Sequence, residues 1–159
     1  MRVDTEVIGE EKVLLDLEKM IQRANDARPA TKKVRDTLVA SNKKTFESEG
    51  SHIGAPWAPL AEATKERKSR EGIDPRPLHG KTGDLAASLT GGKGRKTSAT
   101  KKGARAGTKV FYSVMVGRGA KGDGDAHNTG IPARKLAGVT RSEEHKILDT
   151  VGTYIVHGR

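Results

Sequence analysis

Residues 110–117 (VFYSVMVG) are followed by a glycine-rich polar loop, by residues 127–134 (HNTGIPAR), and by an amphipathic segment that runs almost to the last residue. The β-branched and aromatic residues of 110–117 predict a strand. Thr140 with Glu143 three residues later matches a capping box, so a closing helix is expected to begin there. A strand, a loop, a rigid Ile-Pro-Ala-Arg corner and a final helix favour docking onto other molecules over catalysis.

Upstream of this stretch, apolar residues recur with a helical period. The segment from Glu10 to Ala24 is expected to be a helix, with acidic residues at its positive end. Its apolar face is formed by Val13, Leu14, Leu17, Met20, Ile21 and Ala24. Pro29 is suited to the first turn of a second helix that extends to about Glu47, with Gly50 just beyond its end. The short break between the two helices predicts an antiparallel pair or a bent packing against a sheet.

The middle of the chain predicts shorter elements. Residues 51–59 form a loop that contains Trp57, and residues 61–72 form an almost wholly polar helix. Thr82 or Asp84 is a candidate cap for a short helical turn whose Leu85 and Leu89 face inward.

Two stretches with β-like patterns complete the sheet. Residues 97–100 and 104–109 are expected to form a hairpin, and residues 3–8 a short β-like run. The N-terminal helices, these β-like stretches and the C-terminal helix are expected to form one domain over residues 1–159, with flexible loops at about 50–60 and 90–128.

The composition predicts a small core and a basic surface. Only 33% of the 159 residues are hydrophobic and 3% aromatic, and nineteen are glycine. Segments that become ordered only against partners are therefore expected. The chain has 30 Lys and Arg against 20 Asp and Glu, which favours polyanions or acidic protein surfaces as neighbours. The absence of cysteine excludes disulfides, thiol catalysis and cysteine zinc sites. The sequence shows neither a signal peptide nor a membrane-spanning stretch, so we expect synthesis in the cytoplasm and no membrane partner.

The motifs that would indicate catalysis or cofactor binding are weak. Residues 117–122 match G-x-G-x-x-G, but the polar residues after them predict a loop where a dinucleotide site needs a helix. Asp123, Asp125, His127 and Asn128 resemble part of a calcium loop, yet Arg134 stands where a further carboxylate is needed. The five histidines are scattered, and none has an evident catalytic partner. We expect no catalytic residue, no metal and no cofactor.

Two features leave alternatives open. From Thr90 to Gly122 there are nine Lys or Arg and no acid. This segment would either contact DNA phosphates or form a solvated or protein-docking loop. The candidate contact residues are Lys93, Arg95, Lys96, Lys101, Lys102 and Arg105. Trp57, the only tryptophan, would either anchor an interface or cap a thin core.

Four pieces occur in a specific order along the chain. They are Trp57-Ala-Pro59-Leu60 with Thr64 and Lys68; Leu78-His79 with Thr82-Gly83-Asp84-Leu85 and Ser88-Leu89; Phe111-Tyr112-Ser113; and His127-Asn-Thr-Gly130-Ile-Pro-Ala-Arg134. This ordered set, over roughly residues 3–157, resembles the phage virion morphogenesis family, also called tail completion proteins. The chain departs from the family pattern by the inserted Gly80 and Lys81, by Ser113, and by the stretched spacing between Tyr112 and His127.

The resemblance implies an α+β fold with helices on one face of an antiparallel sheet. It also implies a structural role at the junction of phage tail and head, as a ring subunit, with six copies as the family-level expectation. Expected partners are further copies of the chain, the tail tube protein, the head connector or stopper proteins and, non-specifically, packaged DNA. The expected location is the virion neck after assembly in the host cytoplasm. The expected interface residues are Trp57, Leu60, Tyr112, His127, Ile131, Pro132 and Arg134. The alternative is a basic nucleic-acid-binding module that uses residues 90–122.

Overall fold

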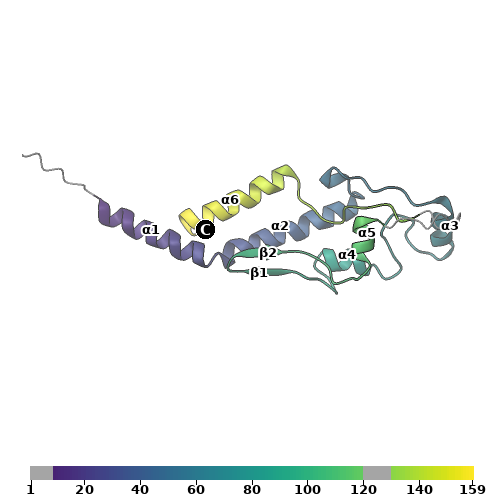
Figure 1. The fold of residues 1–159 in the computed structure, drawn as a ribbon, viewed down its shortest axis with the longest axis horizontal. Coiled ribbons are helices and arrows are strands. Elements are labelled where there is room, and N and C mark those ends of the chain that lie inside the picture. The colour runs from purple at the N-terminus through teal and green to yellow at the C-terminus, as the bar shows by residue number, and fades with distance from the viewer. Residues whose placement is uncertain (1–8, 120–129) are drawn as a thin grey trace, which may run out of the picture.

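The computed structural model of the chain describes residues 9–119 and 130–159. Helix α1 (Glu10–Asn25) extends from one end of an elongated molecule, and α2 (Arg28–Glu47) continues along the long axis (Figure 1). Both helices were predicted nearly to the residue. Of the two arrangements predicted for this pair, the antiparallel one is not found, because the helix that lies antiparallel against α2 is the last one, α6 (Arg141–His157). The β-like run predicted over residues 3–8 lies outside the described residues.

The buried face of α2 is made of small and polar residues. Its fully covered positions are Ala30, Thr31, Ser41, Asn42, Thr45 and Phe46. Val34 and Leu38 lie on the same face of α2 but are only half-buried. Small side chains let neighbouring elements approach the helix closely, so two elements cover α2 at once.

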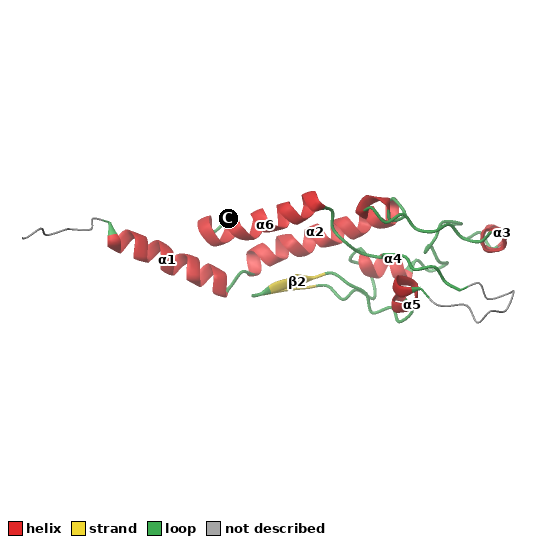
Figure 2. Ribbon diagram, turned by 45° about the horizontal axis from the view of Figure 1, so that its top comes forward, coloured by secondary structure: helices red, strands yellow, loops and turns green. Residues whose placement is uncertain are grey.

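One of these two elements is α6, and the other is a β-hairpin. Strands β1 (Ser98–Thr100) and β2 (Gly103–Arg105) pair antiparallel, with Ser98 opposite Arg105. The hairpin lies along α2 on the side away from α6 (Figures 1 and 2). Its turn is fixed to the start of α2, since Thr31 Oγ1 donates to the Thr100 carbonyl at 2.7 Å. The hairpin and the α+β class are confirmed, although the sheet found in the described residues has only these two strands.

Short helices gather at the far end of the molecule. They are the 3₁₀ turn η1 (Ser51–Ile53), α3 (Glu62–Arg70), α4 (Asp84–Leu89) and α5 (Ser113–Arg118). The polar helix and the short helix were both predicted. The N-cap of α4 is Gly83 in a left-handed conformation, with no side-chain cap, so neither Thr82 nor Asp84 has the predicted capping role.

The strand predicted over residues 110–117 is wrong. The segment turns at Phe111 and Tyr112 and then forms the single helix α5. A strand must find hydrogen-bond partners on a neighbouring strand, whereas a helix supplies its own. In the described part of the chain, neither hairpin strand pairs with this segment. Tertiary context therefore overrides the β propensity of its valines and aromatics.

The core lies where the loops and short helices meet the end of α2. It consists of Phe46, Trp57, Leu85 and Leu89. The rings of Phe46 and Trp57 pack edge to face with their centroids 5.0 Å apart. Gly50 has a positive φ of 86°, and a Cβ there would lie 2.7 Å from the Trp57 ring, so only glycine lets the chain pass this close to the indole. No helix in the described ranges is long and apolar enough to cross a bilayer.

Candidate functional site

Two motifs that are far apart in the sequence exchange hydrogen bonds near the core. The Trp57 indole N–H donates to the Lys135 carbonyl at 2.8 Å. In return, the Arg134 guanidinium donates through Nη2 and Nε to the Ala58 carbonyl, at 2.9 and 3.2 Å. This reciprocal pair, which we call the Trp–Arg lock, joins the Trp-Ala-Pro-Leu segment to the Ile-Pro-Ala-Arg corner.

The Trp–Arg lock lies inside the folded chain. Trp57 is 6% exposed and Arg134 is 5% exposed. Burial lowers the pKa of the Arg134 guanidinium, and the Arg134 backbone N–H donates to the Val116 carbonyl of α5. Of the two interpretations left open for Trp57, the core position is the one it occupies here. Both residues were predicted at an interface, and in this structure they offer a partner little surface.

The other predicted interface residues lie on the surface near the lock. Leu60 and Tyr112 come together in a hollow of about 320 Å³, and the predicted contact residues Ile131 and Pro132 are exposed. His127 lies outside the described residues. The sequence thus predicted surface positions at this end, but their contact with a partner stays a prediction.

An apolar patch surrounds α5 at the same end. Phe111 is 84% exposed and packs edge to face against Tyr112. Val114 and Met115 are also half-exposed. Aromatic and methionine side chains are enriched in protein interfaces, so this α5 patch is a candidate contact surface.

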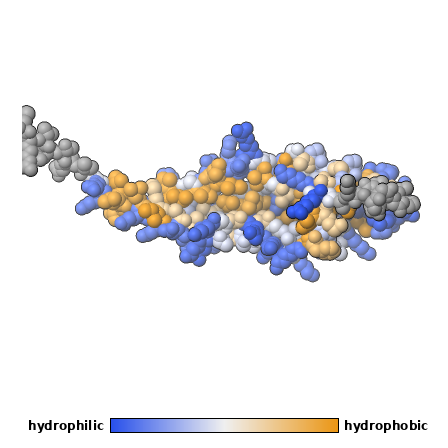
Figure 3. Space-filling model, viewed as in Figure 1, coloured by the Kyte–Doolittle hydropathy of each residue, from blue (hydrophilic) through white to orange (hydrophobic). Residues whose placement is uncertain are grey.

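A second apolar surface runs along α1. The helix has no buried residue, although Val13, Leu14, Leu17 and Ile21 all lie on one side of it. Each of these four side chains is about half exposed. Figure 3 shows apolar atoms over α1 and again over α6. A helix of this length is marginal in water unless its apolar face is covered. We call this side of α1 the α1 face.

The α1 face leads into an apolar groove. Ala24, at the end of the face, is one of the residues that line a cavity of about 410 Å³. Its walls come from α1, α2, the hairpin and α6, namely Ala24, Ala27, Thr31, Val34, Lys101, Lys102, Gly103, Ala104, Ile147, Val151 and Ile155. Three apolar residues of α6, Ile147, Val151 and Ile155, thus line a hollow. We call this cavity the α6 groove.

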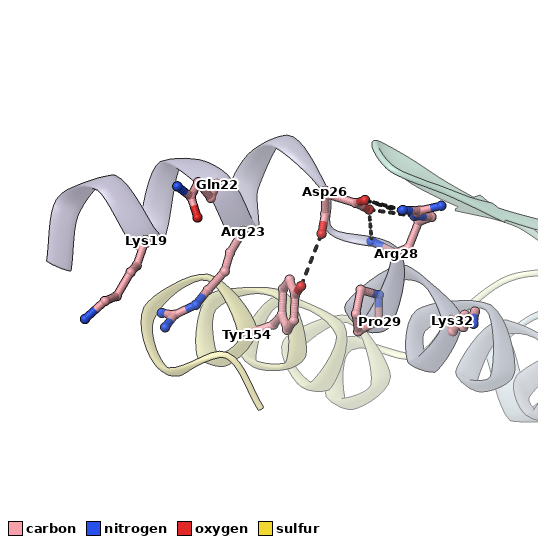
Figure 4. A pocket seen from close by; sticks show the side chains of 8 residues that line it. All are labelled: Lys19, Gln22, Arg23, Asp26, Arg28, Pro29, Lys32 and Tyr154. Atoms are coloured by element: carbon pink, nitrogen blue, oxygen red, sulfur yellow. Dashed lines mark hydrogen bonds and ion pairs between the residues drawn. The ribbon is translucent and has the colours of Figure 1, made fainter. Parts of the chain in front are cut away.

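Hydrogen bonds fix the base of α1 against the end of α6. Arg23 donates to the carbonyls of Ile155 and Val156 at 3.1 and 2.7 Å, where the negative end of a helix favours a cation. The Tyr154 hydroxyl donates to the Asp26 carbonyl at 3.2 Å (Figure 4). Hydrogen bonds from the Arg28 guanidinium hold the pKa of the Asp26 carboxyl below its usual range. This junction orients α1 while leaving its first half free of contacts that bury it.

The basic residues predicted to contact DNA lie on the hairpin and on the loop before it. Lys93, Arg95, Lys96, Lys101, Lys102 and Arg105 are all exposed. Within residues 9–119 and 130–159 none of them forms an ion pair with a carboxylate. An unneutralised, exposed set of cations is what contact with polyanions requires. No structural feature here distinguishes DNA from an acidic protein.

One cluster brings together residue types that are used in catalysis. The Glu143 carboxylate accepts from the Ser41 hydroxyl at 2.7 Å and lies 3.1 Å from His52 Nε2. A nucleophilic triad needs the serine bound to the histidine, but here both residues bind the carboxylate. Ser41 is also 0% exposed, so the cluster is structural.

The Glu143 carboxylate also takes part in the cap at the N-terminus of α6. Glu143 accepts from the Thr140 backbone N–H, and Thr140 accepts from the Glu143 N–H, so the predicted capping box is confirmed. Burial alone would raise the pKa of Glu143, but hydrogen bonds from Thr140, Ser41 and His52 outweigh it and lower the pKa to about 2. Among the described residues no group of His, Cys, Asp and Glu side chains is arranged to hold a metal ion.

A small core, uncovered apolar faces and unpaired surface cations are typical of a subunit of a larger assembly. A sequence profile of the phage virion morphogenesis family matches residues 8–156. The chain belongs to this family, and its role is therefore in the construction of a phage virion. None of the curated proteins or solved structures compared with the chain is significantly similar to it.

The sequence predicted neither the exposure of the α1 face nor the presence of the α6 groove. The α1 face was recognised from its period, but a periodic pattern does not tell whether the cover comes from the same chain. The groove combines four elements and has no local signal. The sequence contains one indication of this, because the apolar Leu15 lies on the side of α1 opposite Leu17, which is unusual for a helix that packs on a single core. In the structure Leu15 is 55% exposed.

Proposed function

We propose that this protein is a structural component of the phage head–tail junction. In this role several copies form a ring that closes the end of the tail tube and joins it to the head connector. The family membership gives the virion role, and the ring and its position are the proposal.

The observation that supports it is the mismatch between covered and uncovered apolar residues. Among the described residues twelve large hydrophobic side chains are exposed, while the core cluster contains four. Soluble monomers rarely expose contiguous apolar surface of this kind, and such surfaces mark sites of protein association. The α1 face and the α5 patch lie at opposite ends of the molecule (Figure 1). Separate contact surfaces at the two ends allow one subunit to bind a neighbouring copy at one end and another virion protein at the other, as a joining protein must.

The experiment is disruption of the gene in the phage. If the protein joins heads to tails, infected cells should accumulate DNA-filled heads and separate tails, and purified protein added to the lysate should restore joined particles. A map of the particle's neck should then show the chain between tail tube and connector. Normal joined particles without the protein would refute the proposal.

The second candidate is a nucleic-acid-binding module, which the unpaired cations of the hairpin favour. Charge reversal at Lys93 and Arg95, which are exposed and do not line the α6 groove, distinguishes the two. A nucleic-acid module should lose salt-dependent binding of free duplex. A junction protein should still form its ring, and only retention of packaged DNA should suffer if these cations face the DNA.

A further inference from the structure

The first half of α1 combines an uncovered apolar face with acidic charge. Residues 10–18 contain four acids, Glu10, Glu11, Asp16 and Glu18, and one lysine. Asp16 forms an ion pair with Lys19 at 3.3 Å, and the other three carboxylates form none among the described residues. The remainder of the chain must then be strongly basic, since the total is +10. This half of the helix therefore differs from the rest of the chain in charge, and together with its apolar face this suits it to bind a basic, apolar surface.

The α6 groove is a surface of that kind. Its floor is apolar, with Ile147, Val151 and Ile155 on one side, while Lys101 and Lys102 stand on the opposite wall. Its volume of about 410 Å³ has room for side chains projecting from one face of a helix but not for the helix itself. A helix lying across the opening would place its apolar residues inside and its acids beside the lysines.

We propose that the α1 face of one copy of this chain binds across the α6 groove of the next copy. The occupant is a second copy because the same chain carries both complementary surfaces. The α1 face is acidic and apolar, and the α6 groove is basic and apolar. Two α1 faces paired in parallel would instead bring acids together.

The contact joins unlike surfaces, so it repeats from one copy to the next. Such a contact closes into a ring when its rotation allows and otherwise grows as a filament. The inference therefore rests on the self-association in the proposed function, and it assigns that self-association to named residues.

The chain has no cysteine, so a pair of introduced cysteines tests the contact directly. Chains carrying only Leu17→Cys are mixed with chains carrying only Ala104→Cys and are oxidised as full-length protein. We expect a disulfide between the two different chains. Leu15→Cys, on the opposite side of α1, is the matched control and should not form a disulfide with Ala104→Cys. Predominant disulfides between two Leu17→Cys chains, or no mixed product, would overturn the proposal.

A second test separates the interface from the ring itself. Leu17→Glu should convert the oligomer to monomer in light scattering, with an unchanged circular dichroism spectrum, while Leu15→Glu should leave the oligomer intact. If the native chain forms a ring that Leu17→Glu does not disrupt, this inference fails and the proposed function stands. If particles join normally without the protein, the proposed function itself fails.

A charge exchange provides a further check. Lys102→Glu should weaken the oligomer at low salt, and Glu18→Lys on the same chain should restore it at least in part, since each new charge faces the other across the contact. Binding of the α1 face to the tail tube protein rather than to a second copy would appear as a Leu17→Cys disulfide to that protein, and it would overturn the proposal.

Discussion

The chain has few large apolar residues, and the two ends of the molecule place them in opposite environments. At one end, Phe46, Trp57, Leu85 and Leu89 are collected into a core and enclosed by the Trp–Arg lock. At the other end, α1 carries as many large apolar residues on one face and buries none of them.

The difference shows which part of the fold is stabilised within the chain. The lock joins segments nearly 80 residues apart, so its hydrogen bonds and burial fix long-range structure. The base of α1 is held by hydrogen bonds to α6 and from it, and the apolar face of α1 contributes little to folding until something covers it. Substitutions at the two ends should therefore have opposite effects on stability and on association.

The largest effect should come from Trp57→Ala. Removing a buried indole and leaving a cavity should reduce the free energy of unfolding by about 3–5 kcal/mol. Chemical denaturation followed by circular dichroism measures this change. Phe111→Ala is the matched control, since Phe111 is also aromatic but is 84% exposed, and it should change stability by less than about 0.5 kcal/mol. Equal losses for the two variants would contradict the division into two ends.

The next largest effect is a loss of folding stability at low pH. The pKa of Glu143 is about 2 in the folded chain, below the reference value of 4.5. Its contribution is therefore complete above pH 4.5 and is lost as the pH falls toward 2, where the folded carboxylate is protonated. The shift corresponds to at most about 3 kcal/mol. Denaturation midpoints between pH 6 and pH 2 measure it.

Glu143→Gln should remove most of this pH dependence and lower stability at pH 6. The control is Glu144→Gln, because Glu144 is exposed in the same first turn of α6. The same acid slope in Glu143→Gln as in the native chain would show that other carboxyl groups cause it.

A smaller loss is expected for Arg134→Met. The variant keeps much of the side-chain volume but leaves the Ala58 carbonyl without its donor, which should cost about 2 kcal/mol. Arg134→Lys tests whether geometry matters, because lysine keeps the charge but lacks the planar fork of the guanidinium. Thermal unfolding measures both. Arg134→Lys should lie between the native chain and Arg134→Met, and full stability of Arg134→Met would argue against the Trp–Arg lock.

The smallest effect should come from Leu14→Ala in α1. Leu14 is 52% exposed, so the unfolding free energy measured at monomeric concentration should change by less than about 0.5 kcal/mol. The same substitution at Leu89, which is 3% exposed, should cost about 2–5 kcal/mol. A large loss for Leu14→Ala would mean that α1 is stabilised within its own chain.

The same two ends differ in how far the sequence predicts them. Helices α1, α2 and α6 were predicted because their periodic patterns and, in α6, the Thr140 capping box are local signals. Residues 110–117 were assigned to a strand because propensity is also local, whereas their helical state depends on the absence of a neighbouring strand.

The candidate site was less accessible to sequence reasoning. Exposed positions such as Ile131 and the cations of the hairpin were recognised as surface residues. Arg134 was placed at an interface because the Ile-Pro-Ala-Arg corner was interpreted as a docking element. Its burial depends on the Ala58 carbonyl, 76 residues away in the chain. The α6 groove needs four elements to be in place before it exists.

The link between α1 and α2 is only two residues long, so a small change of backbone angle there rotates the whole of α1 as a rigid rod. The 16 residues of α1 span about 24 Å, so a turn of about 10° at Asp26 would carry the helix tip about 4 Å sideways. The body behind it, held by the core and the Trp–Arg lock, would not need to deform. In the proposed ring, rotation of α1 about this link would change the diameter of the opening and fit the ring to neighbours of slightly different size without repacking any subunit.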